Sequence, residues 1–344
     1  MAKVFLAALK ASVPCRIDCG GTVDIDPLAL GLKPFGPATL NIALDLPTTV
    51  EVRPAPGQGL VIDSPGFGSL RRGEAASYAS PLGFFLLAAD YFGLDDLAIT
   101  IRSASPPKSA LGGSSAALVA AVAAFGRMSG RKLSRLEAAQ LAHQIEQALF
   151  GLPCGRQDHL AAAFGGINLW TWTPGFGRGY KRRQLLKASA YPVVEARLLV
   201  AYPGQTHASS VVNSAWIEGF VSGRHRRVWL RIVEATKNLA RAIEQRRWKE
   251  AADWLKTETS LRLELTPEVL TAQGLQLVQA AEQAGAGARF CGAGGGGCIY
   301  ALGPKEAMVR LRPAWAEILA GLPGARFLPS QIDRQGLKLE IKKA

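Results

Sequence analysis

Features that would assign this chain to several common classes of protein are missing. Its five cysteines are odd in number and include no Cys-x-x-Cys pair, so the sequence suggests neither a disulfide framework nor a zinc site. No uninterrupted apolar run reaches the roughly 18 residues of a membrane span, and the N-terminus lacks a convincing signal-peptide cleavage pattern. We therefore expect a soluble, cytoplasmic protein without a membrane partner.

Charged residues are also scarce, at 19% of the chain, and they are unbalanced. The net charge of +13 would attract anionic partners such as nucleotides, sugar phosphates or nucleic acid. Two basic clusters, at 181–183 and 224–227, are not interleaved with aromatic residues. Solvated surface charge explains them more simply, so charge alone names no partner and we expect no nucleic acid.

What is present is an ordinary globular composition, with 48% hydrophobic residues in a chain of 344, which favours two packed domains. Strand-like and helix-like patterns alternate without an internal repeat. The clearest are strands at 48–52, 97–101, 167–173, 196–202 and 298–302 and helices at 81–91, 116–125, 134–149, 209–221, 226–257 with a break near 246, and 268–284. They predict an α+β protein divided in the Pro/Gly-rich loop at 174–179, with domains at 1–178 and 179–344.

The most informative segment, at 106–117, reads Pro-Pro-Lys-Ser-Ala-Leu-Gly-Gly-Ser-Ser-Ala-Ala. Glycines let the backbone approach phosphate oxygens, and the start of the buried helix that follows offers unpaired amides and partial positive charge. Serine hydroxyls can bind phosphate or a magnesium ion held by it. The segment is not a P-loop, because no Gly-Lys-Ser/Thr follows at the expected spacing. Taken alone, it fits a plain glycine turn with serine N-caps equally well.

A second glycine-rich segment, at 289–298, satisfies the dinucleotide pattern Gly-x-Gly-x-x-Gly formally, at Gly292, Gly294 and Gly297. That fingerprint should follow a first strand and open a helix. Here it lies near the C-terminus and leads into a strand. We therefore set aside a dinucleotide site and interpret the small residues as a place where the backbone approaches a ligand or another chain segment closely.

A third segment, at 14–25, places Arg16, Asp18 and Asp24 around a Gly-Gly turn. An arginine can stabilise phosphoryl charge, and an aspartate can bind sugar hydroxyls. A polar strand and turn without a ligand is an equally good interpretation of this segment in isolation.

In this order and at these separations, the three segments resemble the three motifs of the GHMP kinases, which include galactokinase, homoserine kinase, mevalonate kinase and phosphomevalonate kinase. The resemblance extends from about Pro14 to Leu302. The segments at 155–168 and 204–209 look like the branch that contains heptose 7-phosphate kinase and fucokinase. The resemblance implies an N-terminal domain like ribosomal protein S5 domain 2, a ferredoxin-like C-terminal domain, and a cleft between them for ATP and substrate.

The resemblance also implies the catalytic and metal-binding groups. Asp158 matches the catalytic aspartate, and Arg16 matches the basic residue that pairs with it. Glu146 matches the acidic magnesium ligand. Ser114 falls at the magnesium-binding serine when the chain is aligned on the Leu-Gly step, whereas alignment on Ser-Ser-Ala selects Ser115.

The remaining motif residues would bind ATP and its acceptor. The ATP-binding set comprises Lys108, Ser109, Ala110, Leu111, Gly112, Gly113, Ser114 and Ser115. The substrate-binding set comprises Asp24, Gly21, Gln157, Gly294 and Gly295. The glycines of 294–297 would also brace the phosphate loop. Two departures from the family pattern stand out: Lys108 occupies a position where glycine is frequent, and the usual Gly-Leu-Gly begins with Ala110. His159 receives no role and is interpreted as structural.

The implied reaction is ATP- and Mg²⁺-dependent phosphorylation of a hydroxyl, expected to be anomeric, of a sugar or sugar phosphate. The resemblance to the heptose 7-phosphate kinase and fucokinase branch makes a D-glycero-D-manno-heptose 7-phosphate-type kinase the leading interpretation, and the positive charge also suits a phosphorylated acceptor. A fucokinase- or galactokinase-like free-sugar kinase and a non-sugar acceptor stay open. The alternative of another class is a non-catalytic protein of this fold or a basic nucleic-acid binder. The oligomeric state is not readable from the sequence.

Overall fold

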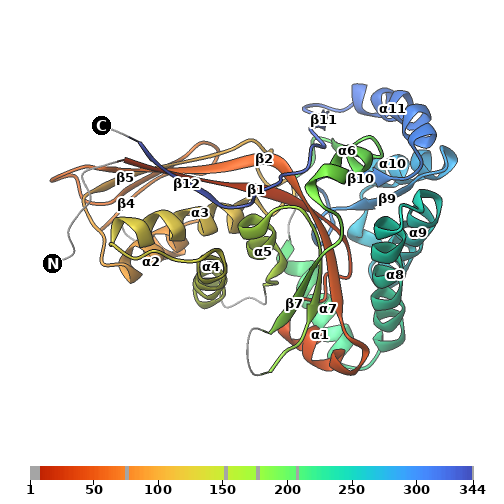
Figure 1. The fold of residues 1–344 in the computed structure, drawn as a ribbon, viewed down its shortest axis with the longest axis horizontal. Coiled ribbons are helices and arrows are strands. Elements are labelled where there is room, and N and C mark those ends of the chain that lie inside the picture. Colours follow the sequence, from red (N-terminus) through yellow and green to blue (C-terminus); the bar gives the residue numbers. More distant parts are fainter. Residues whose placement is uncertain (1–7, 74–76, 151–153, 176–178, 207–208, 343–344) are drawn as a thin grey trace.

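The computed structural model describes residues 8–73, 77–150, 154–175, 179–206 and 209–342, which form two sheets and their covering helices (Figure 1). The first sheet contains β1 (Ala8–Gly20), β2 (Ala38–Pro54), β3 (Val61–Ser64), β4 (Gly68–Arg71), β5 (Leu97–Ser103), β6 (Ile167–Trp172), β7 (Tyr180–Gln184) and β12 (Lys338–Lys342). The second contains β8 (Leu198–Tyr202), β9 (Gly287–Phe290), β10 (Ile299–Leu302) and β11 (Arg326–Leu328). The α-helices are α1 (Asp26–Gly31), α2 (Gly83–Tyr91), α3 (Gly113–Met128), α4 (Arg135–Phe150), α5 (Gln157–Phe164), α6 (Tyr191–Glu195), α7 (Ser209–Val221), α8 (Arg226–Glu244), α9 (Trp248–Leu265), α10 (Ala272–Gln283) and α11 (Lys305–Ala320).

The long strand β2 organises the first sheet. One edge of β2 pairs antiparallel with β1, while the other edge pairs with β6 over residues 38–42 and with β5 over residues 48–54. Val50 and Val52 are buried, and the side chains between and beyond them are more exposed, as a half-buried strand requires. Strand β12 pairs with the outer edge of β1, so a segment from the far end of the chain completes this sheet.

Helices α2 to α5 lie on one face of the first sheet (Figure 1). Helix α3 packs against β1 and β2, and all of its residues from 115 to 126 are buried, as the unbroken apolar run predicts. Helix α4 begins with the predicted capping box. The Glu137 carboxylate accepts a hydrogen bond from the Ser134 amide at 2.7 Å, and the Ser134 hydroxyl accepts one from the Glu137 amide at 3.2 Å.

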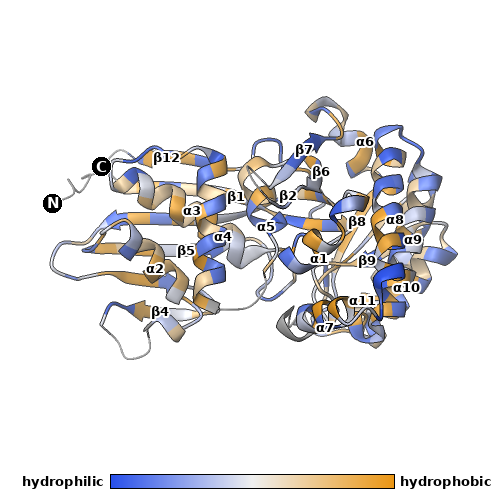
Figure 2. Ribbon diagram, turned by 90° about the horizontal axis from the view of Figure 1, so that it is seen from below, coloured by the Kyte–Doolittle hydropathy of each residue, from blue (hydrophilic) through white to orange (hydrophobic). Residues whose placement is uncertain are grey.

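The second sheet is antiparallel, in the order β11-β8-β10-β9, and α9 packs against β9 and α8. Hydrophobic and hydrophilic residues are interspersed along α8 (Figure 2), and its buried residues are apolar apart from Thr236, as an amphipathic helix requires. The predicted break falls between α8 and α9, where Arg246 adopts a left-handed φ of 59°.

The helix predicted over 268–284 is interrupted. A 3₁₀ turn at Pro267–Val269 precedes α10, which begins only after Thr271, because the Thr271 hydroxyl caps the Gly274 amide at 3.2 Å.

The two sheets with their helices form two adjoining bodies, which confirms the predicted α+β fold (Figure 1). The domain boundary at residue 178 stays a prediction. Strands β7 and β12 both follow that residue, yet both belong to the first sheet. Among the described residues, no helix combines the length and apolar character that crossing a membrane requires.

Candidate active site

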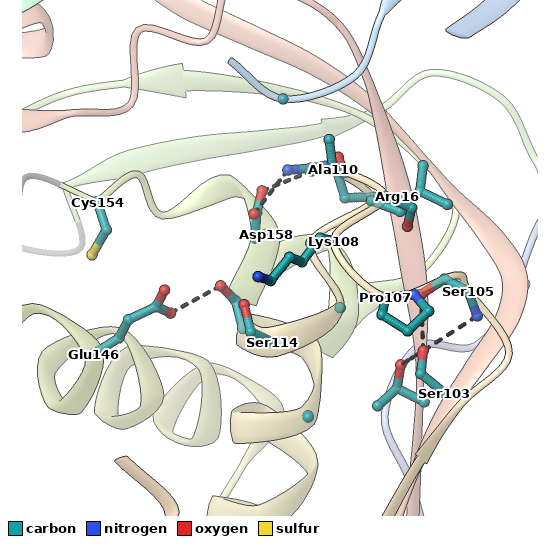
Figure 3. A pocket seen from close by; sticks show the side chains of 18 of the residues that line it. Arg16, Ser103, Ser105, Pro107, Lys108, Ala110, Ser114, Glu146, Cys154 and Asp158 are labelled. Atoms are coloured by element: carbon teal, nitrogen blue, oxygen red, sulfur yellow. Dashed lines mark hydrogen bonds and ion pairs between the residues drawn. The ribbon is translucent and has the colours of Figure 1, made fainter. Parts of the chain in front are cut away.

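A cavity of about 770 Å³ lies where the two bodies meet (Figure 3). All three glycine-rich segments contribute to its wall. The segment at 14–25 contributes Arg16 and Asp24, the segment at 106–117 contributes residues 106–115, and the segment at 289–298 contributes Gly292 and Ala293. The fold thus brings together segments that lie far apart in the sequence, in the way that the ordered motifs predict.

The phosphate loop, residues 108–113, has an alternating backbone. Lys108, Ala110 and Gly112 have left-handed φ values of 52°, 63° and 72°, and the residues between them do not. Such alternation turns successive amide groups toward one concave side and forms an anion-binding nest. Helix α3 begins immediately afterwards, at Gly113, so its unpaired amides and positive dipole end add to the same site.

Three carbonyl groups of the phosphate loop accept hydrogen bonds from other segments of the chain. The Ser109 carbonyl accepts from the Cys298 amide at 2.9 Å. The Ala110 carbonyl accepts from Arg16 Nη1 at 2.6 Å, and the Leu111 carbonyl accepts from the Arg16 amide at 3.0 Å. These three carbonyl groups are paired with β1 and with the residue before β10, and the loop that carries them lines the cavity. Backbone amides of such a loop are suitable donors for a polyanion.

Arg16 and Asp158 form a two-point ion pair at the cavity wall. Arg16 Nε and Nη2 donate to the two carboxylate oxygens of Asp158 at 2.7 and 2.8 Å. Asp158 lies in the first turn of α5, and a β-carbon at Gly112 would lie 3.1 Å from its carboxyl carbon. Burial opposes the charge of Arg16, but Asp158 and Asp18 outweigh burial and raise the Arg16 pKa above its ordinary value. The predicted catalytic pair is therefore brought together beside the phosphate loop.

The predicted metal ligands are also adjacent. The Ser115 hydroxyl donates to Glu146 Oε2 at 2.9 Å, and Glu146, Ser114 and Ser115 all line the cavity. This geometry favours Ser115 over Ser114 as the partner of Glu146. Burial opposes ionisation of Glu146, but the contacts with His159 and Ser115 outweigh it and lower the Glu146 pKa. Hydroxyl and carboxylate oxygens are the donors that Mg²⁺ prefers, so the pair fits that ion.

In the described part of the chain, no group of three or more His, Cys, Asp and Glu could hold a metal.

His159 has a position that the sequence did not predict. Its Nε2 lies 2.8 Å from Glu146 Oε2, and its ring meets the His143 ring edge to face at 5.3 Å. Burial, and then the charge of His159, lower the His143 pKa to about 4, so His143 is neutral at pH 7. His159 therefore contacts the predicted metal ligand Glu146, and its structural role stays a prediction.

Asp24 lies in the cavity wall next to Gln157. Its Oδ2 accepts from the Gln157 amide at 2.9 Å, whereas the buried Oδ1 has no partner among the described residues. Burial raises the Asp24 pKa to about 6, against the effect of the Gln157 amide. The amide oxygen of the Gln157 side chain is also buried and has no partner in the described part of the chain, and both residues line the cavity. Two unpaired buried acceptors in one wall suit a ligand that carries hydroxyl donors.

Two predicted substrate residues, Gly294 and Gly295, do not line the cavity. They pack instead against the turn before α10, where the Gly295 amide donates to the Val269 carbonyl at 2.9 Å. The glycine-rich segment at 289–298 reaches the cavity with its earlier residues, Gly292 and Ala293. Composition alone could not reveal which of six small residues face a ligand.

Gly21, a third predicted substrate residue, lies in a buried ionic network rather than at the cavity. Its amide donates to Glu258 at 3.3 Å, and its carbonyl accepts from Arg262. Arg289 Nε donates to Glu258 at 2.6 Å, and Arg289 Nη1 donates to Asp18 at 2.8 Å. The four charged side chains of this network have no exposed surface. They join β1 of the first body to α9 and β9 of the second.

The network also reaches the cavity wall. Asp18 Oδ1 accepts from the Gly292 amide at 2.6 Å and lies 4.0 Å from Arg16 Nη1. Asp18 therefore connects Arg16 with the turn that carries Gly292. The sequence assigns Asp18 no site role, because two of its partners, Arg289 and Gly292, lie more than two hundred residues away along the chain.

A cluster of hydroxyl groups in the cavity wall was missed entirely. Thr48 and Ser103 share a hydrogen bond of 2.8 Å, and Ser103 and Ser105 share one of 2.9 Å. All three residues line the cavity behind the phosphate loop. No sequence signal marks them, because Thr48 is one of several threonines in a strand and becomes special only through its pairing with β5.

Comparison with known proteins gives consistent matches in both halves of the chain. Residues 80–166 match the model of the GHMP kinases N terminal domain, and residues 239–320 match that of the GHMP kinases C terminal.

The chain is 29% identical to a mevalonate kinase of Thermococcus sibiricus over 254 residues, which cover 70% of this chain and 68% of that protein. A stretch of 63 residues is 43% identical to the D-glycero-alpha-D-manno-heptose 7-phosphate kinase of Campylobacter jejuni and covers 18% and 19% of the two chains. The fold is similar to that of Lactococcus lactis galactokinase complexed with galactose, with a TM-score of 0.71 at 18% identity over 96% and 95% of the chains.

These matches agree with the order of the three motifs, and the fold agrees with the two-domain architecture that the resemblance implies. The chain therefore belongs to the GHMP kinases, a family of ATP-dependent kinases that act on sugars or mevalonate.

Proposed function

We propose that this chain transfers the γ-phosphoryl group of ATP to a hydroxyl group of a sugar or sugar phosphate. The observation that carries the proposal is the position of the Arg16–Asp158 pair. It lies in one cavity wall between the phosphate loop and Asp24, whose Oδ1 has no partner among the described residues. Phosphoryl transfer needs a donor site, a proton acceptor and an oriented hydroxyl at adjoining places.

The triphosphate of ATP fits the phosphate loop, because the amides of the loop and of the α3 N-terminus face the cavity. The purine fits the apolar part of the wall at 81–85, which includes Phe84 and Phe85. Ser115 and Glu146 would hold Mg²⁺, which neutralises phosphate charge when it is bound. His159 keeps the Glu146 carboxylate in place, 2.8 Å from its own Nε2.

The acceptor hydroxyl would be placed by the two aspartates. Asp158 would take the hydroxyl proton or orient the hydroxyl, and Arg16 fixes the plane of the Asp158 carboxylate by holding both of its oxygens. Asp24 Oδ1 would accept a hydrogen bond from a second hydroxyl of the same molecule. A polyol supplies such neighbouring hydroxyls, which is the structural reason to prefer a sugar.

The choice among sugars rests on weaker support. A D-glycero-D-manno-heptose 7-phosphate, phosphorylated at its anomeric hydroxyl, is our first candidate, and the short stretch of high identity to a heptose 7-phosphate kinase supports it. A free sugar of the fucose or galactose type is the second. Mevalonate is the candidate outside the sugars, because the longer alignments are with mevalonate kinases.

Binding of nucleic acid has less support. The basic cluster at 181–183 is engaged within the protein: Arg182 Nε donates to Asn168 at 2.7 Å, its guanidinium stacks 4.6 Å from the Phe164 ring, and Arg183 pairs with Glu244 at 2.8 Å. Nucleic-acid binding would depend steeply on salt and would need no nucleotide.

A coupled ADP-release screen over sugars, sugar phosphates and mevalonate tests the proposal. ADP should form only when ATP, Mg²⁺ and an acceptor are all present, and Asp158→Asn should lower kcat at least about 10²-fold while ATP still binds. Asp253→Asn, at an exposed position on α9, is the matched control. Near-normal turnover of the true acceptor by the Asp158→Asn variant would refute the role of Asp158. ADP release with mevalonate, and with none of the sugars or sugar phosphates, would refute the proposal that the acceptor is a sugar.

A further inference from the structure

Lys108 is the cationic side chain of the phosphate loop, and it differs from Arg16 in having no bound partner among the described residues. Among the described residues that line it, Arg16, Arg102 and Lys108 carry positive charge. The side chain of Arg16 is occupied by Asp158 and by the Ala110 carbonyl. Within the described ranges, the Lys108 ammonium has neither a hydrogen bond nor an ion pair, although its side chain is exposed to the cavity.

The backbone of Lys108 is held in an unfavourable conformation. Its φ of 52° lies in the left-handed region, which costs an L-residue with a long side chain about 1–2 kcal/mol and which glycine adopts freely. The two prolines before it restrict the approach of the chain. Figure 3 shows the Lys108 side chain pointing into the cavity, in the direction of Asp158 and Ser114. A lysine held under backbone strain at a cavity wall indicates a use for its side chain.

The charges of the site also leave room for one more cation. Three carboxylates line the cavity, those of Asp24, Glu146 and Asp158, and the one buried arginine is neutralised by Asp158. A phosphoryl group in transfer spreads negative charge over its three non-bridging oxygens, so it needs donors that are not already committed to a carboxylate. Lys108 is the cation of the phosphate loop that meets this requirement.

We propose that Lys108 is a further catalytic residue, whose ammonium group contacts the γ-phosphoryl oxygens as the group moves to the acceptor. The proposal rests on the kinase function proposed above. In the step, the bond from the γ-phosphorus to the bridging oxygen breaks and its electron pair leaves with ADP. The acceptor oxygen forms the new bond to phosphorus, and the acceptor proton passes to Asp158. Lys108 stays protonated throughout and stabilises the charge that develops between Asp158 and the phosphate loop.

Three substitutions separate the charge of Lys108 from its backbone strain. Lys108→Asn removes the charge but suits a left-handed conformation, Lys108→Gly removes charge and strain together, and Lys108→Arg keeps the charge. We expect Lys108→Asn and Lys108→Gly to lower kcat at least about 10²-fold with a less than tenfold change in the Kd of a non-hydrolysable ATP analogue. Lys108→Arg should recover part of kcat, and Lys108→Gly should raise Tm by relieving strain.

Arg246→Gly is the matched control, because Arg246 has a similar φ of 59° between α8 and α9 and does not line the cavity. It should raise Tm as Lys108→Gly does and leave kcat unchanged. The proposal is overturned if the kcat of Lys108→Asn stays within threefold of the wild-type kcat. It is also overturned if the variant weakens binding of the ATP analogue by the same factor as it lowers kcat/KM and leaves kcat unchanged, because Lys108 would then only bind ATP. A wild-type chain that binds ATP but phosphorylates no acceptor would instead overturn the kinase function, and the role of Lys108 with it.

Discussion

The two aspartates of the cavity are held in different ways, and the difference sets their properties. Arg16 binds both oxygens of Asp158, whereas Asp24 receives one amide hydrogen bond and keeps one buried oxygen without a partner among the described residues. Burial therefore dominates at Asp24 and raises its pKa to about 6. Two carboxyl groups of one site that lie in different environments can have different roles in the same reaction.

Asp24→Asn should stabilise the protein in a pH-dependent way. Because the Asp24 pKa is raised from 3.8 to about 6, the native state binds the proton more tightly than the unfolded state does. The ionised group therefore lowers the free energy of unfolding progressively as pH rises from about 4 to about 6, and the penalty is complete above that range. At pH 8 the variant should be more stable than wild type by on the order of 2 kcal/mol, with a smaller difference at pH 4.5.

Denaturant unfolding at the two pH values measures this effect, and Asp45→Asn at an exposed position controls for the substitution itself. The KM of the acceptor should rise in the Asp24→Asn variant, because the new side-chain amide would present a donor where the acceptor hydroxyl needs a hydrogen-bond acceptor. A stability difference that is equal at both pH values would contradict the buried-carboxylate account.

Several individual site residues could be predicted because the sequence motifs that identify them span only a few neighbouring residues. Arg16, Asp158 and Glu146 stand in recognisable segments, and the structure places all three at the cavity. The choice between Ser114 and Ser115 could not be made from the sequence. It depends on the rotation of α3 against α4, which is what joins Ser115 to Glu146.

At the scale of elements, the phosphate loop takes its shape from the segment before β10. The Cys298 amide holds the Ser109 carbonyl at 2.9 Å. A β-carbon at Gly297 would lie 2.7 Å from the Ala110 Cβ and 2.8 Å from the Ser109 carbonyl oxygen. The absence of a side chain at Gly297 is therefore what lets the second body support the loop, as the predicted bracing role requires.

Gly297→Ala should displace the phosphate loop and weaken ATP binding. Gly297 has a φ of 80°, so alanine there meets both backbone strain and a steric clash with Ala110. Gly324→Ala supplies the comparison, because Gly324 has a φ of 72° and open space around it. We expect similar small losses of Tm from the strain, but a rise of about tenfold or more in the KM for ATP only in Gly297→Ala. Equal KM values in the two variants would refute the bracing role.

Helices and motif-bearing turns were predicted well because their signals lie within a few residues. The capping box at Ser134, the buried α3 and the break near Arg246 are examples. The location of Gly21, and the return of β12 to the first sheet, were not predicted. Both depend on contacts between segments hundreds of residues apart, which leave no periodic pattern in a single sequence.

At the scale of the whole molecule, the buried ionic network fixes one body against the other. Asp18 belongs to β1, whereas Glu258 and Arg262 belong to α9 and Arg289 belongs to β9. The guanidinium of Arg262 also lies 4.6 Å from the Trp216 ring. Two positive and two negative side chains balance, so each member is compensated only while the others are present.

Arg289→Met should therefore be severely destabilising, because it leaves Asp18 and Glu258 buried with fewer partners. We expect a loss of about 3–5 kcal/mol in the free energy of unfolding. Arg224→Met breaks an exposed pair with Glu218 and should cost less than about 1 kcal/mol. Urea unfolding of the two variants tests the account, which fails if they lose similar stability.

The central claim, that the chain moves the γ-phosphoryl group of ATP to a sugar hydroxyl, is tested most directly by following that group. ATP labelled at its γ-phosphoryl group is incubated with Mg²⁺, the chain and the acceptor found by the ADP-release screen, and the products are separated. We predict that the label appears in the sugar in the same amount as ADP, and that Asp158→Asn abolishes this transfer. Label found only in inorganic phosphate, or retained in ATP with every sugar and sugar phosphate, would contradict the claim.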